Sequence, residues 1–178
     1  MRANFKIGKW NIGFMSRVVI LKESEEMQGY TNKCRGNNYI IMIDYDTEDF
    51  EQVIDDVKFV QQKHELSDFY IFRTTKGYHA VCLDKVTWLE LKYILEDSNC
   101  DSAFKFFPYT IGKKMHTLRL SKKRGKDVLF CGVTKSHFNE RDKSNAHFLM
   151  LRKLFNIPPL QLNNLDDETE IIISGYKR

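Results

Sequence analysis

The stretch "YIIMIDYDTED", residues 39 to 49, places two aspartates directly after a run of mostly aliphatic residues. The run is short and rich in isoleucine, which predicts a strand buried on both faces. Because strand side chains alternate between faces, Asp44 and Asp46 are expected to share one side. Two such carboxylates repel each other unless a cation lies between them. The residues alone leave two interpretations open: turn and helix-capping residues, or ligands of a hard cation such as Mg²⁺.

The composition is typical of a folded, mildly basic protein. The chain has 178 residues, of which 42% are hydrophobic, and a formal net charge of +4. This length suits one well-packed domain, so we expect residues 1–178 to form a single unit. Lysine and arginine are concentrated in "IGKKMHTLRLSKKRGKD", residues 111 to 127. Such a basic segment suits a phosphate ligand, or it is a solvated surface face.

The cysteines and the apolar segments indicate an intracellular, cytoplasmic protein. The four cysteines form no CxxC pair and have no neighbours at zinc-finger spacing, so we expect reduced thiols. We find no signal peptide at the N-terminus and no apolar run that approaches membrane-spanning length.

Hydrophobic periodicity along the chain predicts an α+β fold. Strands are expected at residues 17–23, 39–45, 67–75, 78–83, 116–121, 127–133 and 170–176, and helices at 47–66, 87–97 and 143–155. The third and fourth strands should form one hairpin, and the fifth and sixth another across a basic turn. We therefore expect an antiparallel or mixed sheet with helices packed on one face. The aspartates, the first hairpin turn and the basic hairpin can then share the open face.

The stretch "FRTTKGYHAVCL", residues 72 to 83, carries the second motif. Gly77 is expected to permit a tight turn and to let another group approach closely. Arg73 and Lys76 are donors suited to an anion, and His79 follows one strand step after the turn. An isolated strand histidine is more often a structural residue than a ligand. Its position after an Asp-x-Asp strand favours a functional role.

Three motifs together resemble those of the archaeo-eukaryotic primase superfamily. "IMIDYD" is similar to the family's acidic strand end, and "TTKGYHAVCL" is similar to its small-x-His turn, with glycine where serine is commoner. "TLRLSKKRGK" resembles the Arg-Leu strand and lysine-rich turn of primase-polymerases. Asp101 in "NCDSAF" takes the place of the third acidic residue, although its separation from Arg119 is longer than usual. The resemblance covers residues 39 to 130 and implies an RRM-like sheet with a primase-polymerase-type catalytic core.

The resemblance implies a template-directed nucleotidyltransferase of DNA replication or repair. Such an enzyme makes or extends primers from nucleoside triphosphates with two divalent ions, Mg²⁺ or Mn²⁺. Asp44, Asp46 and Asp101 would be the metal-binding, catalytic residues. His79 would donate to the incoming triphosphate and Arg119 would neutralise it. Further candidates for phosphate or template contacts are Arg73, Lys76, Lys122 and Lys123, each of which is otherwise a surface residue or, for Arg73, a salt-bridge partner.

The implied partners are a single-stranded DNA template and nucleoside triphosphates, with no membrane. The sequence contains neither a P-loop motif nor paired cysteine ligands. A helicase would therefore act in trans or on a longer parent chain.

Two other classes of function remain open from the sequence. The first is a non-catalytic nucleic-acid or nucleotide-binding module, in which Tyr45, Tyr70 and Tyr78 would stack on bases at an exposed sheet face. The second is a metal-dependent nuclease, because paired acids with a nearby lysine also suit hydrolysis. A nickase with two histidines around one apolar residue is disfavoured because the strand holds only His79.

Overall fold

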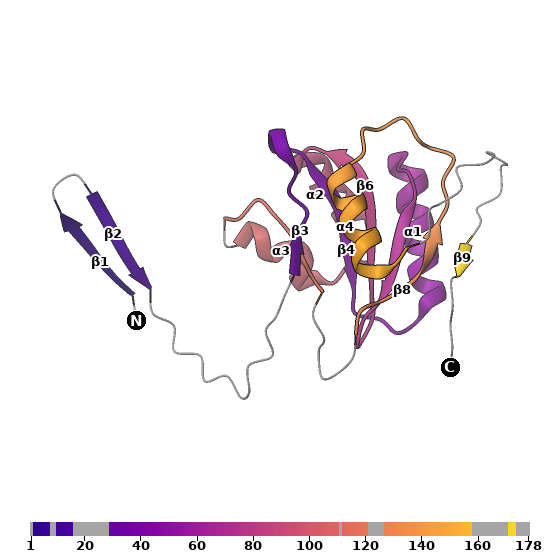
Figure 1. Cartoon of the computed structure of the whole chain (residues 1–178), viewed down its shortest axis with the longest axis horizontal. Coiled ribbons are helices and arrows are strands. Elements are labelled where there is room, and N and C mark those ends of the chain that lie inside the picture. Colours follow the sequence, from indigo (N-terminus) through magenta and orange to yellow (C-terminus); the bar gives the residue numbers. More distant parts are fainter. Residues whose placement is uncertain are drawn as a thin grey trace.

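A five-stranded antiparallel sheet forms the centre of the protein (Figure 1). The structure is a computed structural model that describes residues 2–7, 10–15, 29–110, 112–120, 127–157 and 171–173. The strands follow the order β4 (Tyr39–Tyr45), β6 (Tyr78–Val86), β5 (Phe69–Arg73), β8 (Leu129–Thr134) and β9 (Ile171–Ile173). The α+β class expected from the sequence is therefore confirmed, whereas the primase-polymerase-type core stays a prediction.

The strands β4, β5 and β6 form a split β-α-β unit with helix α1 (Phe50–His64). β6 lies between β4 and β5 and is antiparallel to both, so β4 and β5 run in the same direction. The carboxyl end of β4 consequently lies beside the start of β6. This arrangement brings the first two sequence motifs together at one end of the sheet.

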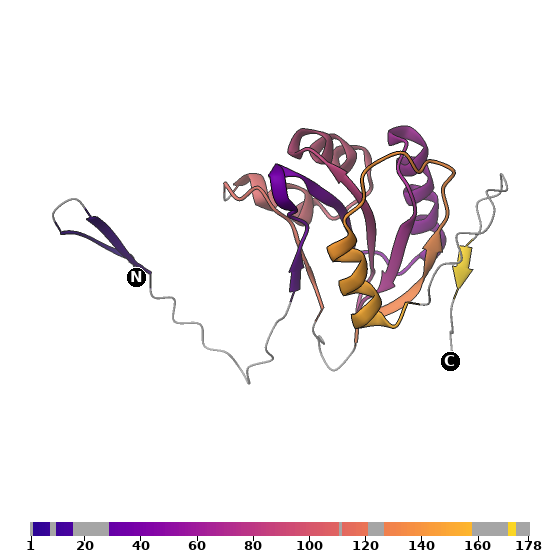
Figure 2. The same ribbon diagram turned by 45° about the horizontal axis from the view of Figure 1, so that its top comes forward.

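Helices cover both faces of the sheet. On one face, α1 and α2 (Trp88–Asp97) bury residues such as Val57 and Leu91 against Ile43 of β4. On the other face, α4 (Asn145–Phe155) buries Leu151 in a cluster that includes Met42. Figures 1 and 2 show α4 and α1 on opposite sides of the sheet. The expectation of helices on one face only is wrong, because β4 is apolar on both faces and both need cover.

Two smaller antiparallel pairs accompany the main sheet. β1 (Arg2–Ile7) pairs with β2 (Trp10–Met15), and β3 (Gly29–Thr31) pairs with β7 (Thr117–Arg119). The expected hairpin of residues 116–121 with 127–133 is therefore wrong, since β7 pairs with β3 and β8 pairs with β5. The structure adds a short 3₁₀ helix, Arg35–Asn37, and α3, Ser102–Thr110, which the sequence did not predict. The strand expected at residues 17–23 lies outside the described residues.

Capping residues fix where two of the helices begin. Thr87 opens α2 with a capping box: its side chain accepts from the Glu90 amide, and the Glu90 carboxylate accepts from the Thr87 amide. At α1 the capping side chain belongs to Asp49, which accepts from the Gln52 amide at 3.1 Å. Thr47 accepts from the Asp49 amide at 3.2 Å. Both residues thus hold the turn between β4 and α1.

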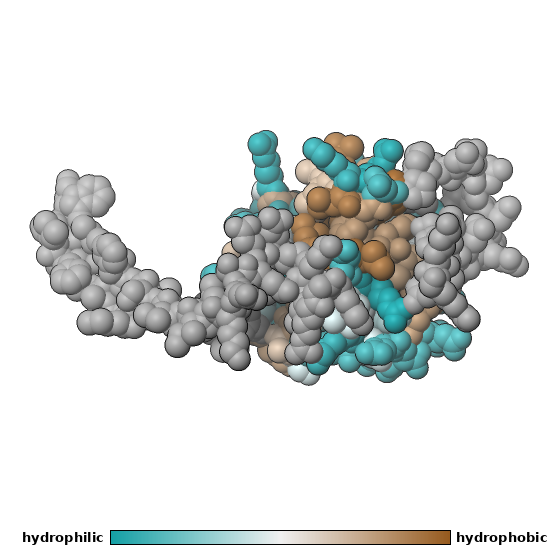
Figure 3. Space-filling view, turned by 60° about the horizontal axis from the view of Figure 1, so that its bottom comes forward, coloured by the Kyte–Doolittle hydropathy of each residue, from teal (hydrophilic) through white to brown (hydrophobic). Residues whose placement is uncertain are grey.

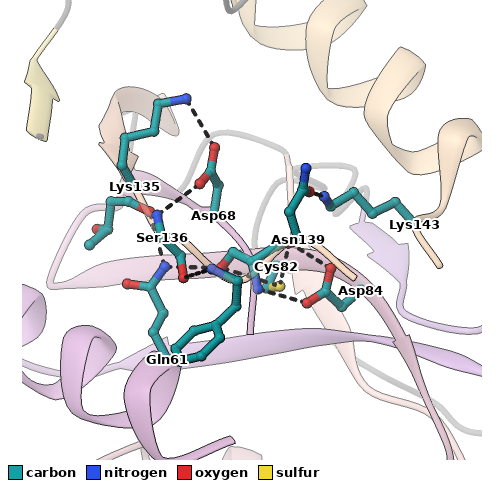
Figure 4. A network of polar contacts seen from close by, with 11 residues as sticks. Gln61, Asp68, Cys82, Asp84, Lys135, Ser136, Asn139 and Lys143 are labelled. Atoms are coloured by element: carbon teal, nitrogen blue, oxygen red, sulfur yellow. Dashed lines mark hydrogen bonds and ion pairs between the residues drawn. The ribbon is translucent and has the colours of Figure 1, made fainter. Parts of the chain in front are cut away.

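A buried polar network lies near the opposite end of β6 from His79 (Figure 4). Asp84 is fully buried and accepts from the amide of Ser67 at 2.7 Å and from its hydroxyl at 2.5 Å. Gln61 of α1 donates to the carbonyl oxygens of Ser67 and Thr134. Asp84 lies five positions after His79 along the strand, a distance of about 17 Å. These hydrogen bonds join α1, the loop before β5, β6 and β8, and we assign a stabilising role to the network.

The four cysteines are free thiols, as expected from their spacing. Burial raises the pKa of the Cys82 thiol, and it raises that of Cys100 to about 12. In the part of the chain that the structure describes, no helix combines the length and apolar character needed to cross a membrane.

Candidate functional site

Asp44 and His79 meet on neighbouring strands at the carboxyl end of β4. They occupy paired positions in the register of β4 with β6. Nε2 of His79 lies 3.4 Å from Oδ1 of Asp44, and the Asp44 side chain is 33% exposed whereas that of His79 is only 6% exposed. The imidazole of His79 is thus buried, whereas the Asp44 carboxylate beside it is accessible to solvent. The structure brings together the residues of the first two motifs.

Arg119 approaches the same imidazole from the small β3–β7 sheet. Burial and, secondarily, the positive charge of Arg119 lower the pKa of His79 to about 3. The imidazole is therefore neutral at pH 7, and its contact with Asp44 is not an ion pair. A neutral imidazole donates one hydrogen bond without adding charge, so Arg119 supplies the positive charge beside it. The sequence prediction that His79 and Arg119 act on one ligand is compatible with this proximity.

Asn32 docks the strand that carries Arg119 against β4. Its side chain donates to the carbonyl oxygen of Ile40 at 3.3 Å and accepts from the amide of His116 at 2.8 Å. Its backbone amide donates to the His116 carbonyl at 3.1 Å, and its carbonyl accepts from the Ile40 amide at 2.9 Å. Asn32 is fully buried. The residue, which sequence reasoning missed because it lies in a polar loop, holds β7 next to β4.

Asp101 lies next to Asp44 through the backbone. The amide of Asp101 donates to the carbonyl oxygen of Asp44 at 2.7 Å. Its carboxylate caps α3, with Oδ2 accepting from the Phe104 amide at 2.7 Å. One carboxylate oxygen is therefore already used by the helix. The third acidic residue of the sequence analysis is near the first, but capping alone is sufficient to explain its residue type.

Asp46 and Asp101 line one pocket of about 220 Å³ beside this site. β4 ends at Tyr45, so the strand alternation that predicted a shared side for Asp44 and Asp46 does not extend to Asp46. Asp46 is exposed. The pocket is otherwise lined by Tyr45, Thr47, Gln52, Asn99, Cys100 and Ser102. Several of these residues carry carboxylate, hydroxyl or amide oxygens, which are the atoms that hard cations bind.

A second set of hydrogen bonds holds the walls of that pocket. The Tyr45 hydroxyl donates to Asp56 Oδ2 at 2.8 Å, and Asp56 accepts from the amide and side chain of Asn99 at 2.8 to 3.1 Å. Burial and then the charge of Asp56 raise the pKa of Tyr45, which keeps its hydroxyl a donor. Asp56 thereby ties the end of β4 to α1 and to the loop before Asp101. These positioning residues carry no sequence motif, because they are brought together only by tertiary packing.

Gly77 lets the turn after β5 pack against the end of β4. A Cβ at this position would overlap the carbonyl oxygen of Tyr45 and lie 2.9 Å from its carbonyl carbon and 3.2 Å from the Thr47 amide. Among the residues described, the glycines with positive φ are Gly36 and Gly112. Of its two expected roles, close approach is thus the one that the structure requires of Gly77.

The other predicted phosphate or template contacts, Arg73 and three lysines, do not gather around His79 among the described residues. Arg73 pairs with Tyr78 in the β5–β6 register, and Tyr78 is the neighbour of His79 in the chain. Because neighbouring strand residues point to opposite faces, Arg73 and Tyr78 lie on the face covered by α1. Its charge acts on Tyr78 and Cys131 of that face. Lys76 is exposed in the turn. The structure does not bring Arg73 to the face of His79, and Lys122 and Lys123 lie outside the described residues.

No group of three or more histidine, cysteine, aspartate or glutamate side chains close enough to hold a metal ion occurs within the described ranges. The donors nevertheless fit a hard cation whose remaining ligands come from a substrate, since Mg²⁺ commonly uses one or two carboxylates together with phosphate oxygens. Asp44, which solvent reaches, and the exposed Asp46 are two side chains of that kind at this strand end.

Comparisons of this chain with models of known protein families, with curated proteins and with solved structures found no match.

Proposed function

We propose that the protein is a template-directed nucleotidyltransferase that makes or extends primers from nucleoside triphosphates. The observation that carries the proposal is the contact of Asp44 with His79 at one end of the sheet, where the imidazole also feels the positive charge of Arg119. A carboxylate, a neutral hydrogen-bond donor and a nearby positive charge support this proposal. Phosphoryl transfer needs these elements, because catalysis consists of positioning and of stabilising charge on phosphate oxygens.

In this proposal each residue has one task. Asp44 and Asp46 would hold Mg²⁺ or Mn²⁺ together with phosphate oxygens of the substrate, and the ions would supply positive charge to those oxygens. His79 donates a hydrogen bond to the triphosphate, and Arg119 neutralises it. Asp56 and Gly77 position the strand end that carries the acids. A single-stranded DNA template is the proposed partner, with a role in replication or repair.

A non-catalytic nucleic-acid-binding module is the second candidate. It is favoured by the use of the Asp101 carboxylate as a helix cap, which leaves fewer acids for metal ions. It is disfavoured by the burial of the tyrosines that would stack on bases. Tyr45, Tyr70 and Tyr78 are each at most 5% exposed, because both sheet faces are covered. A metal-dependent nuclease uses similar acids but has no need for the His79–Arg119 pair.

One set of assays separates the three functions. The protein is incubated with a primed or unprimed single-stranded DNA template, nucleoside triphosphates and Mg²⁺ or Mn²⁺. Primer extension or dinucleotide synthesis supports the proposal. Cleavage of a labelled oligonucleotide without any triphosphate supports a nuclease, and binding of the strand without incorporation or cleavage supports the binding module.

A further inference from the structure

The segment from residue 101 to residue 119 begins and ends at the candidate site. At its start, the amide of Asp101 donates to the carbonyl oxygen of Asp44 at 2.7 Å. At its end, the positive charge of Arg119 acts on the His79 imidazole. Between these ends lies α3, which is about 14 Å long, and β7 follows it. A ligand bound on the outer surface of this segment is therefore a neighbour of the candidate site.

α3 closes the edge of the main sheet at β4, the first strand in the order of the sheet. Phe104 of α3 packs against both core clusters, which lie on opposite faces of the sheet, so it covers the edge between them. In Figures 1 and 2, α3 lies to the left of the main sheet. Ser102, Ala103 and Phe106 are exposed. The side of α3 that does not contact the sheet thus faces solvent.

α2 and α3 pack against each other and form one outer surface. Nζ of Lys105 donates to the carbonyl oxygen of Ser98, directly after α2, at 3.0 Å. Near the start of α2, the ring centroid of Trp88 lies 5.2 Å from that of Tyr109. Nζ of Lys92 lies 5.9 Å from the same Tyr109 ring. The two helices are therefore antiparallel neighbours, and the surface that they share begins beside the candidate site.

Aromatic and basic side chains are exposed on these two helices and directly after them. Tyr93, which follows Lys92 on α2, is 52% exposed, and Phe106 of α3 is 54% exposed. Phe106 lies four residues, or about 6 Å, after the start of α3. Lys113 and Lys114 are exposed after the end of α3. Exposed hydrophobic side chains also appear in Figure 3 as brown areas between hydrophilic ones. Exposure alone is therefore not the argument; the connection of this surface to the candidate site is.

The charges of this surface favour an anionic partner. The acids of α2 are each ion-paired with a lysine or an arginine: Glu90, Glu96 and Asp97. Lys105 donates to backbone carbonyl oxygens, which carry no net charge. Lys113 and Lys114 add positive charge after α3. Lysines next to exposed aromatic rings suit single-stranded nucleic acid, because its phosphates attract cations and its bases stack on aromatic side chains.

We propose that the α2–α3 surface, defined by Tyr93, Phe106, Lys113 and Lys114, binds the single-stranded DNA template next to the candidate site. The inference rests on the proposed function, because it assumes that a template strand reaches Asp44. Bases stack on the two aromatic rings, and the lysines contact backbone phosphates. Stacking tolerates any sequence, as copying of a template requires, and it leaves the Watson–Crick edges of the bases free for pairing.

Fluorescence anisotropy of a labelled single-stranded oligodeoxynucleotide, titrated with the full chain, tests the proposal. Phe106→Ala and Tyr93→Ala should each weaken binding about 5- to 150-fold, because each removes a ring on which a base stacks. Both side chains are more than half exposed, so the variants should fold. Phe59→Ala is the matched control and should leave binding unchanged. Phe59 is 52% exposed and has Lys63 5.6 Å from its ring centroid, but it lies on α1.

The salt dependence of binding tests the lysines separately. Combined replacement of Lys113 and Lys114 by alanine should make the affinity fall less steeply with salt concentration. Each lost phosphate contact should reduce the slope of log affinity against log salt by about 0.7. An unchanged slope would remove these two lysines from the surface.

The surface and the proposed function fail in different ways. Wild-type DNA affinity in Phe106→Ala and Tyr93→Ala, or an equal loss in Phe59→Ala, would overturn the surface alone. If sedimentation showed that the wild type self-associates and these variants do not, while DNA affinity stayed unchanged, the surface would be a protein interface. Weaker DNA binding by the variants without nucleotide incorporation by the wild type would keep a strand-binding surface and overturn the enzyme. Absence of DNA binding by the wild type would overturn both.

Discussion

Asp44 and His79 face each other across β4 and β6, with the imidazole Nε2 3.4 Å from the carboxylate Oδ1. The two residues are 35 positions apart in the chain, and the split β-α-β unit makes them neighbours. Burial and the nearby Arg119 keep the imidazole neutral. A carboxylate, a neutral donor and a cation therefore meet at one strand end, where a rigid sheet fixes their positions.

Arg119→Ala should weaken triphosphate binding more than template binding. Loss of a charge-assisted contact to phosphate corresponds to about 10- to 100-fold in affinity. Titrations with a nucleoside triphosphate and with single-stranded DNA measure the two effects. Arg73→Ala is the matched control, because Arg73 lies on the opposite face of the sheet. Equal losses in the two titrations, or a larger loss from Arg73→Ala, would count against the assignment.

Gly77→Ala should destabilise the protein by about 3 kcal/mol or more, since the added Cβ overlaps the Tyr45 backbone. Gly112→Ala serves as the comparison. Gly112 has a φ of +66° but no atom within 4 Å of an added Cβ, so only the backbone conformation costs free energy, about 1 to 2 kcal/mol. Urea denaturation of both variants measures the difference. If Gly77→Ala lowered the free energy of unfolding less than Gly112→Ala does, residue 77 would not be closely packed against the Tyr45 backbone.

Asn32→Ala should reduce both stability and triphosphate affinity. The substitution leaves the Ile40 carbonyl and the His116 amide without their side-chain partner, which costs about 1 to 3 kcal/mol for each buried group left unsatisfied. It also loosens β7, which carries Arg119. Thermal denaturation and triphosphate titration test the two effects together. Lower stability with full triphosphate affinity would refute the docking role of Asn32.

Stability should fall as the pH decreases below about 6.5. Burial lowers the pKa of His116 to about 4, and burial with Arg119 lowers that of His79 to about 3, both from 6.5. The unfolded chain therefore binds protons that the folded protein excludes, and each histidine contributes up to about 1.4 kcal/mol per pH unit between these values. Above pH 6.5 this contribution is fully present.

His116→Phe isolates one of these contributions. His116 is 2% exposed and its ring packs against the rings of Trp88 and Phe104, so an apolar ring should be tolerated. Urea denaturation at several pH values should give a shallower decrease for His116→Phe than for the wild type. His137→Phe, at an exposed position, provides the control. Identical pH profiles for His116→Phe and the wild type would contradict the buried, neutral state of His116.

The sequence predicted the parts of the fold that depend on local pattern. The buried strand at residues 39–45, the capped helix from Thr87 and the hairpin around Gly77 follow from periodicity, capping and turn chemistry. The motifs predicted that Asp44 and His79 belong to one site, whereas their paired positions come from the pairing of β4 with β6. The strand, the helix and the hairpin depend on residues close to one another in the chain.

The sequence did not predict the features that depend on distant pairing. Residues 116–121 and 127–133 are close along the chain, and their pattern predicts a hairpin. In the structure β7 instead pairs with β3, which lies about 90 residues earlier. Asn32 and Asp56 acquire their roles only when loops and helices meet. The second helical layer was missed because an apolar strand indicates burial of both faces without identifying what covers them.

Nucleotide incorporation by Asp44→Asn tests the central claim most directly. Asparagine preserves the shape of the side chain and removes its charge, so the variant should fold with an unchanged melting temperature. Asp55→Asn, at an exposed position on α1, is the matched control. We predict that Asp44→Asn lowers primer extension or dinucleotide synthesis by about 100-fold or more, whereas Asp55→Asn leaves it unchanged. Incorporation by a folded Asp44→Asn variant at the wild-type rate would contradict the proposed site.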